Sequence, residues 1–171
     1  AYDEARATHE RALAIRRRSL GPTHPAVGYS LNNLATTLLA VGDIEGAKVM
    51  FEQALAIWTE SLGPEHPNVN ATLGNLATTY FELGEYEEAE KLYARVLELD
   101  EKKFGPDNPT LGYSILGLAN VHRATGEYDQ AIAQYERSLE IREAAFGPDH
   151  PDLAHSLHGL AEVALDQGRP A

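Results

Sequence analysis

The stretch "GPTHPAVGYSLNNLATT" at residues 21–37 decides the fold, because close copies of it return at a constant interval. The copies are "GPEHPNVNATLGNLATT" at 63–79, "GPDNPTLGYSILGLANV" at 105–121 and "GPDHPDLAHSLHGLAEV" at 147–163. Their leading glycines, Gly21, Gly63, Gly105 and Gly147, are each 42 residues apart. A strict period of this length is typical of a solenoid built from repeated pieces of secondary structure.

Each repeat is predicted to form two antiparallel helices joined by a turn. Pro25 suits the first turn of a helix, and the residue before it, His24, is expected to lie in a cap or loop. Apolar residues then recur at helical spacing until Gly42, which is expected to end this first helix. The acidic residues that follow, Asp43 and Glu45, favour the start of a second helix, which runs to the next Gly-Pro.

Residues 1–171 are predicted to form a single all-α repeat domain of eight helices. The parts are a second helix of a truncated repeat at 1–20, full repeats at 24–62, 66–104 and 108–146, and the first helix of a half repeat at 150–168. One helix pair cannot bury its own apolar face, so neighbouring pairs must stack to complete the core. Alanines recur where helices must approach closely: Ala35, Ala77, Ala119 and Ala161 in the first helices, and Ala47, Ala89 and Ala131 in the second.

The composition excludes several classes of function. The formal charge of −12 argues against general nucleic-acid binding. The absence of cysteine excludes disulfides, thiolate metal sites and a cysteine nucleophile, and is compatible with the cytoplasmic location that we expect. No stretch is apolar enough to span a membrane, and because no signal peptide or initial methionine is visible we expect an excised fragment. No phosphate-binding loop or nucleophile elbow occurs, so we expect neither an enzyme nor a cofactor.

The positions Leu34-Ala35, Leu38, Gly42, Ile44, Ala47, Phe51 and Ala54-Leu55 carry a family resemblance. Together with the matching residues of the next repeat, they resemble the tetratricopeptide repeat, and the period of 42 with its Gly-Pro-x-His-Pro joint resembles the kinesin light chain type. The resemblance implies a right-handed α-solenoid in which first helices line a concave groove and second helices form the back. It also implies a protein–protein interaction module that binds an extended peptide or partner segment in that groove.

The family's groove register, carried onto this sequence, gives candidate peptide-binding residues on the first helices. These are Tyr29, Asn32, Asn33, Thr36 and Leu39 in the first full repeat, Asn75, Thr78 and Phe81 in the second, Tyr113, Leu116, Asn120 and Arg123 in the third, and His155 and His158 in the last helix. Asparagine amides can pair with both the C=O and the N–H of a peptide, although these side chains could also be merely solvated. Arg123 is the only basic residue in this register, so a clamp for a carboxylate or an acidic peptide is not expected.

The histidines allow further interpretations. His155, His158 and Glu162 share one helical face and are the only plausible metal ligands, but we expect no biological metal because three ligands at a chain end favour an adventitious site. The joint histidines are expected to cap helices, and His122 is expected to be a partnered core residue. Trp58 is interpreted either as an anchor for a partner on the back of the solenoid or as a ring packed over the neighbouring repeat.

Two other functions remain open at this point. One is a structural role, as a spacer or as a segment that associates head to tail, since the chain begins with a second helix and ends with a first helix. The other is a regulatory repeat region of a larger enzyme or signalling protein. The expected partner is therefore a protein or peptide, with no nucleic acid and no membrane.

Overall fold

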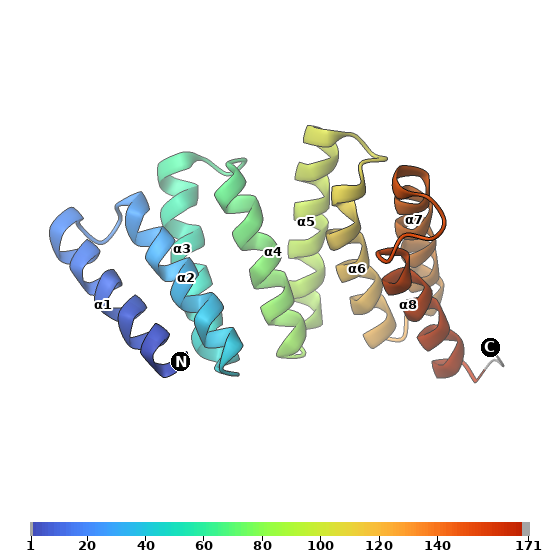
Figure 1. Cartoon of the computed structure of the whole chain (residues 1–171), viewed down its shortest axis with the longest axis horizontal. Helices are drawn as coiled ribbons and strands as arrows, with labels where there is room; N and C mark the ends of the chain where they lie inside the picture. The colour runs from blue at the N-terminus through green and yellow to red at the C-terminus, as the bar shows by residue number, and fades with distance from the viewer. Residues whose placement is uncertain (1, 169–171) are drawn as a thin grey trace. The chain divides into compact units, whose positions relative to one another are not determined.

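The computed structural model describes residues 2–168, with side chains from Glu4 onward, and this part of the chain contains eight α-helices, one short 3₁₀ turn and no strand (Figure 1). The helices are α1 (Tyr2–Leu20), α2 (Pro25–Ala40), α3 (Ile44–Leu62), α4 (Pro67–Glu82), α5 (Tyr86–Phe104), α6 (Gly112–Ala124), α7 (Tyr128–Phe146) and α8 (Leu153–Asp166), and the 3₁₀ turn η1 (Pro109–Leu111) precedes α6. The prediction of an all-α chain of alternating first and second helices is confirmed.

The chain divides into two compact units. Unit 1 comprises Ala1–Glu85 with α1 to α4, and unit 2 comprises Tyr86–Ala171 with α5 to α8. Within each unit, every helix packs against the next one in chain order, and in unit 2 the first helices α6 and α8 also contact each other. The successive packing expected for a repeat array is therefore present inside both units.

Glycine ends both helices of a repeat. Gly63 follows α3 with a φ of +90°, and Gly42 follows α2 with a φ of +82°, in the left-handed region that other residues rarely adopt. At the end of α2, the N–H of Asp43 donates to the C=O of Leu38 at 2.9 Å, so the turn also satisfies a carbonyl that the helix leaves unpaired. The equivalent glycines, Gly21, Gly84, Gly105, Gly126, Gly147 and Gly168, have the same backbone conformation.

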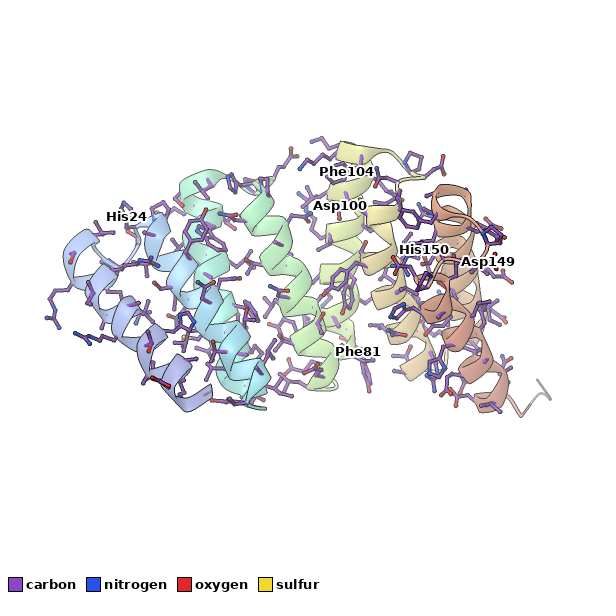
Figure 2. All side chains as sticks on the ribbon, in the orientation of Figure 1. His24, Phe81, Asp100, Phe104, Asp149 and His150 are labelled. Atoms are coloured by element: carbon purple, nitrogen blue, oxygen red, sulfur yellow. The ribbon has the colours of Figure 1, made fainter. Side chains whose placement is uncertain are left out.

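The histidine of the Gly-Pro-x-His-Pro joint caps the helix that follows it. His24 Nδ1 accepts a hydrogen bond from Ala26 N–H at 3.1 Å, and His66 Nδ1 accepts one from Asn68 N–H at the same distance. Each imidazole thus satisfies one of the N–H groups that the first turn leaves unpaired, while the proline that follows has no N–H to satisfy. The prediction that these histidines cap helices is confirmed, and Figure 2 shows His24 and His150 beside their joints.

The first helices of the later repeats begin differently from those of the earlier ones. Asn108 replaces the joint histidine, and its Oδ1 accepts from Thr110 N–H at 3.0 Å, but the chain then makes the 3₁₀ turn before α6 starts. Before α8, Leu153 N–H donates to His150 C=O, a three-residue bond that keeps Pro151 and Asp152 in a turn. Tighter turns of this kind are common at helix ends, so α6 and α8 are shorter than the sequence predicts.

The cores follow the predicted small and large positions. In unit 1, Ala35 on α2 and Ala47, Phe51 and Ala54 on α3 are completely buried. In unit 2, Ala119, Ala131, Tyr135 and Val163 form one buried cluster, with side chains from α6, α7 and α8. Alanine at these sites lets the helices approach closely, and a larger side chain would overpack them.

Candidate functional site

The surface of the first helices in unit 1 carries an exposed tyrosine whose orientation is fixed. Tyr29 on α2 is 49% exposed, and its ring packs edge-on against Trp58 of α3 with the ring centres 5.0 Å apart. Its hydroxyl oxygen accepts a hydrogen bond from Asn68 Nδ2 at 2.8 Å, which links α2 to α4. We call the surface formed by Tyr29, Asn32, Thr36, Leu39 and their equivalents on α4, α6 and α8 the first-helix face.

The rest of this face in unit 1 is uncharged until the end of α4. Asn32 and Leu39 are half-buried and Thr36 is exposed, so a ligand can reach all three. Thr36 Oγ1 donates to the C=O of Asn32 at 3.0 Å, so this hydroxyl offers a ligand only its acceptor lone pair. The amide of Asn32 therefore provides the main two-way hydrogen-bonding group on α2.

The other two predicted asparagines lie at the edge of this face. Asn33 and Asn75 occupy the register of Gly117 and Gly159, which lie directly against the rings of Tyr93 and Tyr135 from the preceding second helix. The register therefore faces the preceding second helix more than the centre of the first-helix face. Asn33 is exposed and Asn75 is half-buried, so both remain reachable from the side.

On α4, the two remaining candidates lie close to the helix end. Thr78 is half-buried and its hydroxyl donates to the C=O of Gly74 at 3.2 Å. Phe81 is also half-buried and is labelled near the end of α4 in Figure 2. A partly accessible phenyl ring gives this end of the face an apolar contact point.

In unit 2 the first-helix face has a second exposed tyrosine in the same register. Tyr113 on α6 is 50% exposed, and its ring meets the edge of Tyr93 from α5 with the ring centres 6.1 Å apart. Leu116 is half-buried and Asn120 is exposed. Asn120 Oδ1 accepts a hydrogen bond from the hydroxyl of buried Tyr135 at 2.6 Å, which orients the amide and leaves its NH₂ group as the donor for a ligand.

A double ion pair closes the other end of this face. Arg123 of α6 donates from Nε to Asp166 Oδ2 at 2.7 Å and from an Nη to Glu162 Oε2 at 2.8 Å, both on α8. The hydrogen bond from Asp166 is the main cause of the raised pKa of Arg123, and burial raises the pKa of nearby Tyr135. The single base of the face is thus neutralised by two carboxylates, which agrees with the expectation that it holds no acidic ligand.

The last two candidates, His155 and His158, are both exposed on α8. Glu162, the third member of the possible metal set, is engaged by Arg123 instead. Among residues 2–168, no group of three or more histidine, aspartate or glutamate side chains is arranged to hold a metal ion. The three residues therefore do not converge, because Arg123 one repeat earlier competes for the carboxylate.

The prediction that His122 is a partnered core residue is confirmed. It is buried, and its Nδ1 lies 2.7 Å from Glu127 Oε2. Glu127 directly precedes α7, so this contact ties the end of α6 to the start of the second helix of the same repeat. The role is structural.

The interpretation of Trp58 as an anchor for a partner is wrong. Trp58 is 2% exposed, and its Nε1 donates to the C=O of Pro25 at 3.1 Å. The indole occupies the space left by Gly28, where a Cβ would come within 2.5 Å of Nε1. Arg142, at the same register in unit 2, fills the space beside Gly112 and donates to the C=O of Asp152. The register looked solvated because of its arginines, but it lies at a joint where both side-chain types pair with backbone carbonyls.

Sequence reasoning also missed Asn68 and Asp166, which the structure joins to Tyr29 and Arg123. A signal was present in each case, because the partners are separated by 39 residues (Tyr29 and Asn68) and by 43 residues (Arg123 and Asp166), close to one period. Side chains of adjacent first helices that differ by about one period are neighbours. A base and an acid at that separation therefore indicate an ion pair between repeats.

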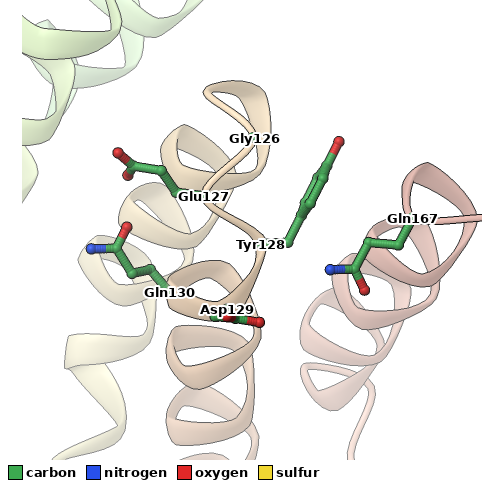
Figure 3. A pocket seen from close by; sticks show the side chains of 6 residues that line it. All are labelled: Gly126, Glu127, Tyr128, Asp129, Gln130 and Gln167. Carbon is green, nitrogen blue, oxygen red and sulfur yellow. The ribbon is translucent and has the colours of Figure 1, made fainter.

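One pocket of about 380 Å³ lies away from the first-helix face, at the start of α7. It is lined by Gly126, Glu127, Tyr128, Asp129, Gln130 and Gln167. Figure 3 shows Tyr128 and Gln167 extending from α7 and from the end of α8 toward the space between these helices. Glu127 is already engaged by His122, so the lining offers no convergent set of groups for catalysis or metal binding.

Comparison with known proteins identifies the class to which this architecture belongs. The sequence profile of the tetratricopeptide repeat matches residues 1–57, 31–102, 68–135 and 110–171, which together cover the chain. The chain belongs to the tetratricopeptide repeat family. A comparison with curated proteins finds no significant match.

Solved structures show which members of the family are similar. The nearly identical TPR-like repeats of a kinesin light chain candidate from Podosopora anserina are 29% identical in two crystal structures, with TM-scores of 0.85 and 0.84 over 98% of this chain and 79% of that one. BtubC (BKLC) from P. vanneervenii is 25% identical, with a TM-score of 0.84 over 98% of this chain and 66% of that one. RapI in its apo form is 16% identical with a TM-score of 0.78, over 98% of this chain and 44% of that one, and shows the fold alone. The resemblance to kinesin light chain-type repeats is confirmed.

Proposed function

We propose that the protein binds an extended segment of a partner protein across the first-helix face of its units. Tetratricopeptide repeats are in general protein-interaction modules, and no catalytic reaction is proposed for this one. The observation that carries the proposal is the pair Tyr29 and Tyr113, one in each unit, each half-exposed and held edge-on by an aromatic ring of a second helix. An aromatic side chain that is already ordered loses little conformational freedom when a ligand covers it.

The neighbouring groups favour main-chain recognition. Asn32 and Asn120 present amides beside the two tyrosines, and an amide can both donate to a peptide C=O and accept from an N–H. Because Asn120 Oδ1 is already engaged by Tyr135, the two units differ in what they offer: both donor and acceptor in unit 1, and mainly a donor in unit 2. An acidic ligand is disfavoured in unit 2, where Arg123 is already paired twice.

A peptide library screened by fluorescence anisotropy tests this proposal. Replacing Tyr29 and Asn32 together with alanine is expected to weaken a selected peptide at least about 10-fold, as hot-spot residues do. Thr59→Ala, at an exposed position of α3, is the matched control and should leave binding unchanged. Binding that survives Tyr29→Ala/Asn32→Ala and also Asn32→Ala/Asn33→Ala/Asn75→Ala would place the ligand on another surface.

The finer expectations on location and context are part of the proposal. None of the helices within residues 2–168 is long and apolar enough to cross a membrane. The absence of cysteine supports a cytoplasmic compartment, which imaging of a tagged full-length protein would test. A regulatory repeat region of a larger enzyme or signalling protein would use the same face. A structural role instead draws support from a different surface, the outer side of α8.

A further inference from the structure

The outer side of α8 exposes side chains that are buried at the equivalent positions of the other first helices. Leu157 is 52% exposed, whereas Leu31 on α2 and Ile115 on α6 are completely buried. Ala161 is exposed, whereas Ala35 and Ala119 are completely buried. The difference arises because α3 covers α2 and α7 covers α6, while within residues 2–168 no second helix covers α8.

The helix α1 has the complementary property. It is a second helix by its sequence, and within the described residues it packs against α2 alone. Ala5, His9 and Ala12 are half-buried, although their equivalents on α3, Ala47, Phe51 and Ala54, are completely buried. Ile15 is 53% exposed, against 7% for Ile141 on α7.

We propose that α8 of one molecule binds α1 of a second copy, in the register that α6 and α7 use inside unit 2. This contact is independent of ligand binding on the first-helix face. In that register Tyr135 of α7 donates a hydrogen bond to Asn120 of α6. A shift of whole 42-residue periods converts this pair into His9 of the second copy against Glu162 of α8, an imidazole N–H opposite a carboxylate.

The apolar part of the contact follows from the same shift. Ala5 and His9 of the second copy occupy the places of Ala131 and Tyr135, which pack against Ala119 in the buried cluster of unit 2, so they cover Ala161. Leu13 takes the place of Leu139 and lies opposite Leu157. Covering Leu157 and Ala161 removes exposed apolar surface from water, which drives the association.

Charge steers the two ends together. Residues 1–20 contain five arginines and three acidic residues, so they carry a net positive charge. Residues 86–171, which form unit 2, contain sixteen acidic and eight basic residues. Opposite net charges on the two surfaces speed encounter and disfavour contacts between like ends.

One position keeps the association weak. In α2 and α6 the joint residue packs against a glycine, Gly28 or Gly112, but α8 has Ala154 there. The methyl group meets Arg16 of the second copy, whose flexible guanidinium group must move aside. The small contact and this displacement predict dissociation constants on the order of 0.1 mM, and open-ended chains because the contact is head to tail.

Sedimentation equilibrium of the full chain over a wide concentration range tests the proposal. The mass is expected to rise above that of the 18.7 kDa monomer as concentration increases, without stopping at a dimer. Leu157→Glu is expected to weaken association at least about 10-fold, because it places a charge in the contact. Leu165→Glu makes the same change on the same helix at a residue that is 62% exposed and outside the contact, and should leave association unchanged.

The two ends are then tested against each other. His9→Glu places a carboxylate opposite Glu162 and is expected to block the α1 end, as Leu157→Glu blocks the α8 end. A mixture of these two variants retains one good end of each kind and should form a 1:1 dimer that grows no further. Unfolding midpoints measured by circular dichroism confirm that both variants fold, as expected for partly exposed sites.

Three results would overturn the proposal: a wild-type chain that stays monomeric at about 1 mM, equal effects of Leu157→Glu and Leu165→Glu, or a mixture that forms no dimer. None of these would affect the first-helix face, since a peptide selected there should bind Leu157→Glu as well as wild type. Loss of peptide binding with intact self-association would instead refute only the proposed function.

Discussion

Units 1 and 2 are built on the same repeat but join their first helices by different chemistry. In unit 1 the link between α2 and α4 is a neutral hydrogen bond, from Asn68 to Tyr29, and the joint of α3 with α2 is filled by Trp58. In unit 2 the link between α6 and α8 is the ion pair of Arg123 with Glu162 and Asp166, and the matching joint is filled by Arg142. The glycines and alanines hold the backbone constant, so the side chains that connect repeats are free to set the charge of the binding surface.

The joint residue gives the largest expected effect. Trp58→Ala removes a buried indole and is expected to cost about 3–5 kcal/mol of unfolding free energy, measured by urea denaturation. Trp58→Arg imitates Arg142 of unit 2 and should cost much less, about 1–2 kcal/mol, because an arginine fits beside a glycine there and can donate to the same carbonyl. Equal losses from the two variants would show that the joints of the two units are not interchangeable.

The capping residue at the joint comes next in size. His66→Ala removes the acceptor for Asn68 N–H and is expected to cost about 1 kcal/mol. His66→Asn introduces the residue that unit 2 uses at Asn108, and should stay within about 0.5 kcal/mol of wild type in the same urea titration. A large loss with asparagine would mean that the imidazole has a role beyond capping.

The smallest effects distinguish the two links. Arg123→Leu introduces the residue found at Leu39, and is expected to cost about 0.2–1 kcal/mol because the ion pairs are partly exposed. Tyr29→Phe removes the hydrogen bond in unit 1 at a similar cost, about 0.5–1 kcal/mol. Raising NaCl from about 0.05 M to about 1 M should shrink the effect of Arg123→Leu and leave that of Tyr29→Phe unchanged. A salt response of the same size in both variants would remove the contrast between the units.

The sequence was sufficient for the elements and their ends. The 42-residue period, the prolines at the helix starts and the glycines at the helix ends predict all eight helices, since each signal acts on the local backbone. Capping by His24 and His66 was also predictable, because a side chain before an N1 proline has only the first N–H groups within reach. The later starts of α6 and α8 were not, because a 3₁₀ turn and an α-turn compete at similar cost there.

The candidate site was predictable in part. The register correctly placed Tyr29, Tyr113 and Asn120 on an accessible surface, because helical spacing fixes which side chains share a face. It did not show that Trp58 is buried, since burial there depends on Gly28 one helix earlier. It also did not show that Arg123 is neutralised, because that depends on rotamers of two side chains on another helix. Pairing between repeats, and not position within a repeat, limits the inference.

The positive-φ glycines have a practical consequence for engineering. Because Gly21, Gly63, Gly105 and Gly147 share one backbone conformation, a segment cut between any two of them carries matching ends. Such a cassette can be duplicated or exchanged in tandem without designing a new linker, as each corner is closed by its own main chain. Longer arrays with chosen orders of neutral and charged links are thus within reach of simple gene assembly.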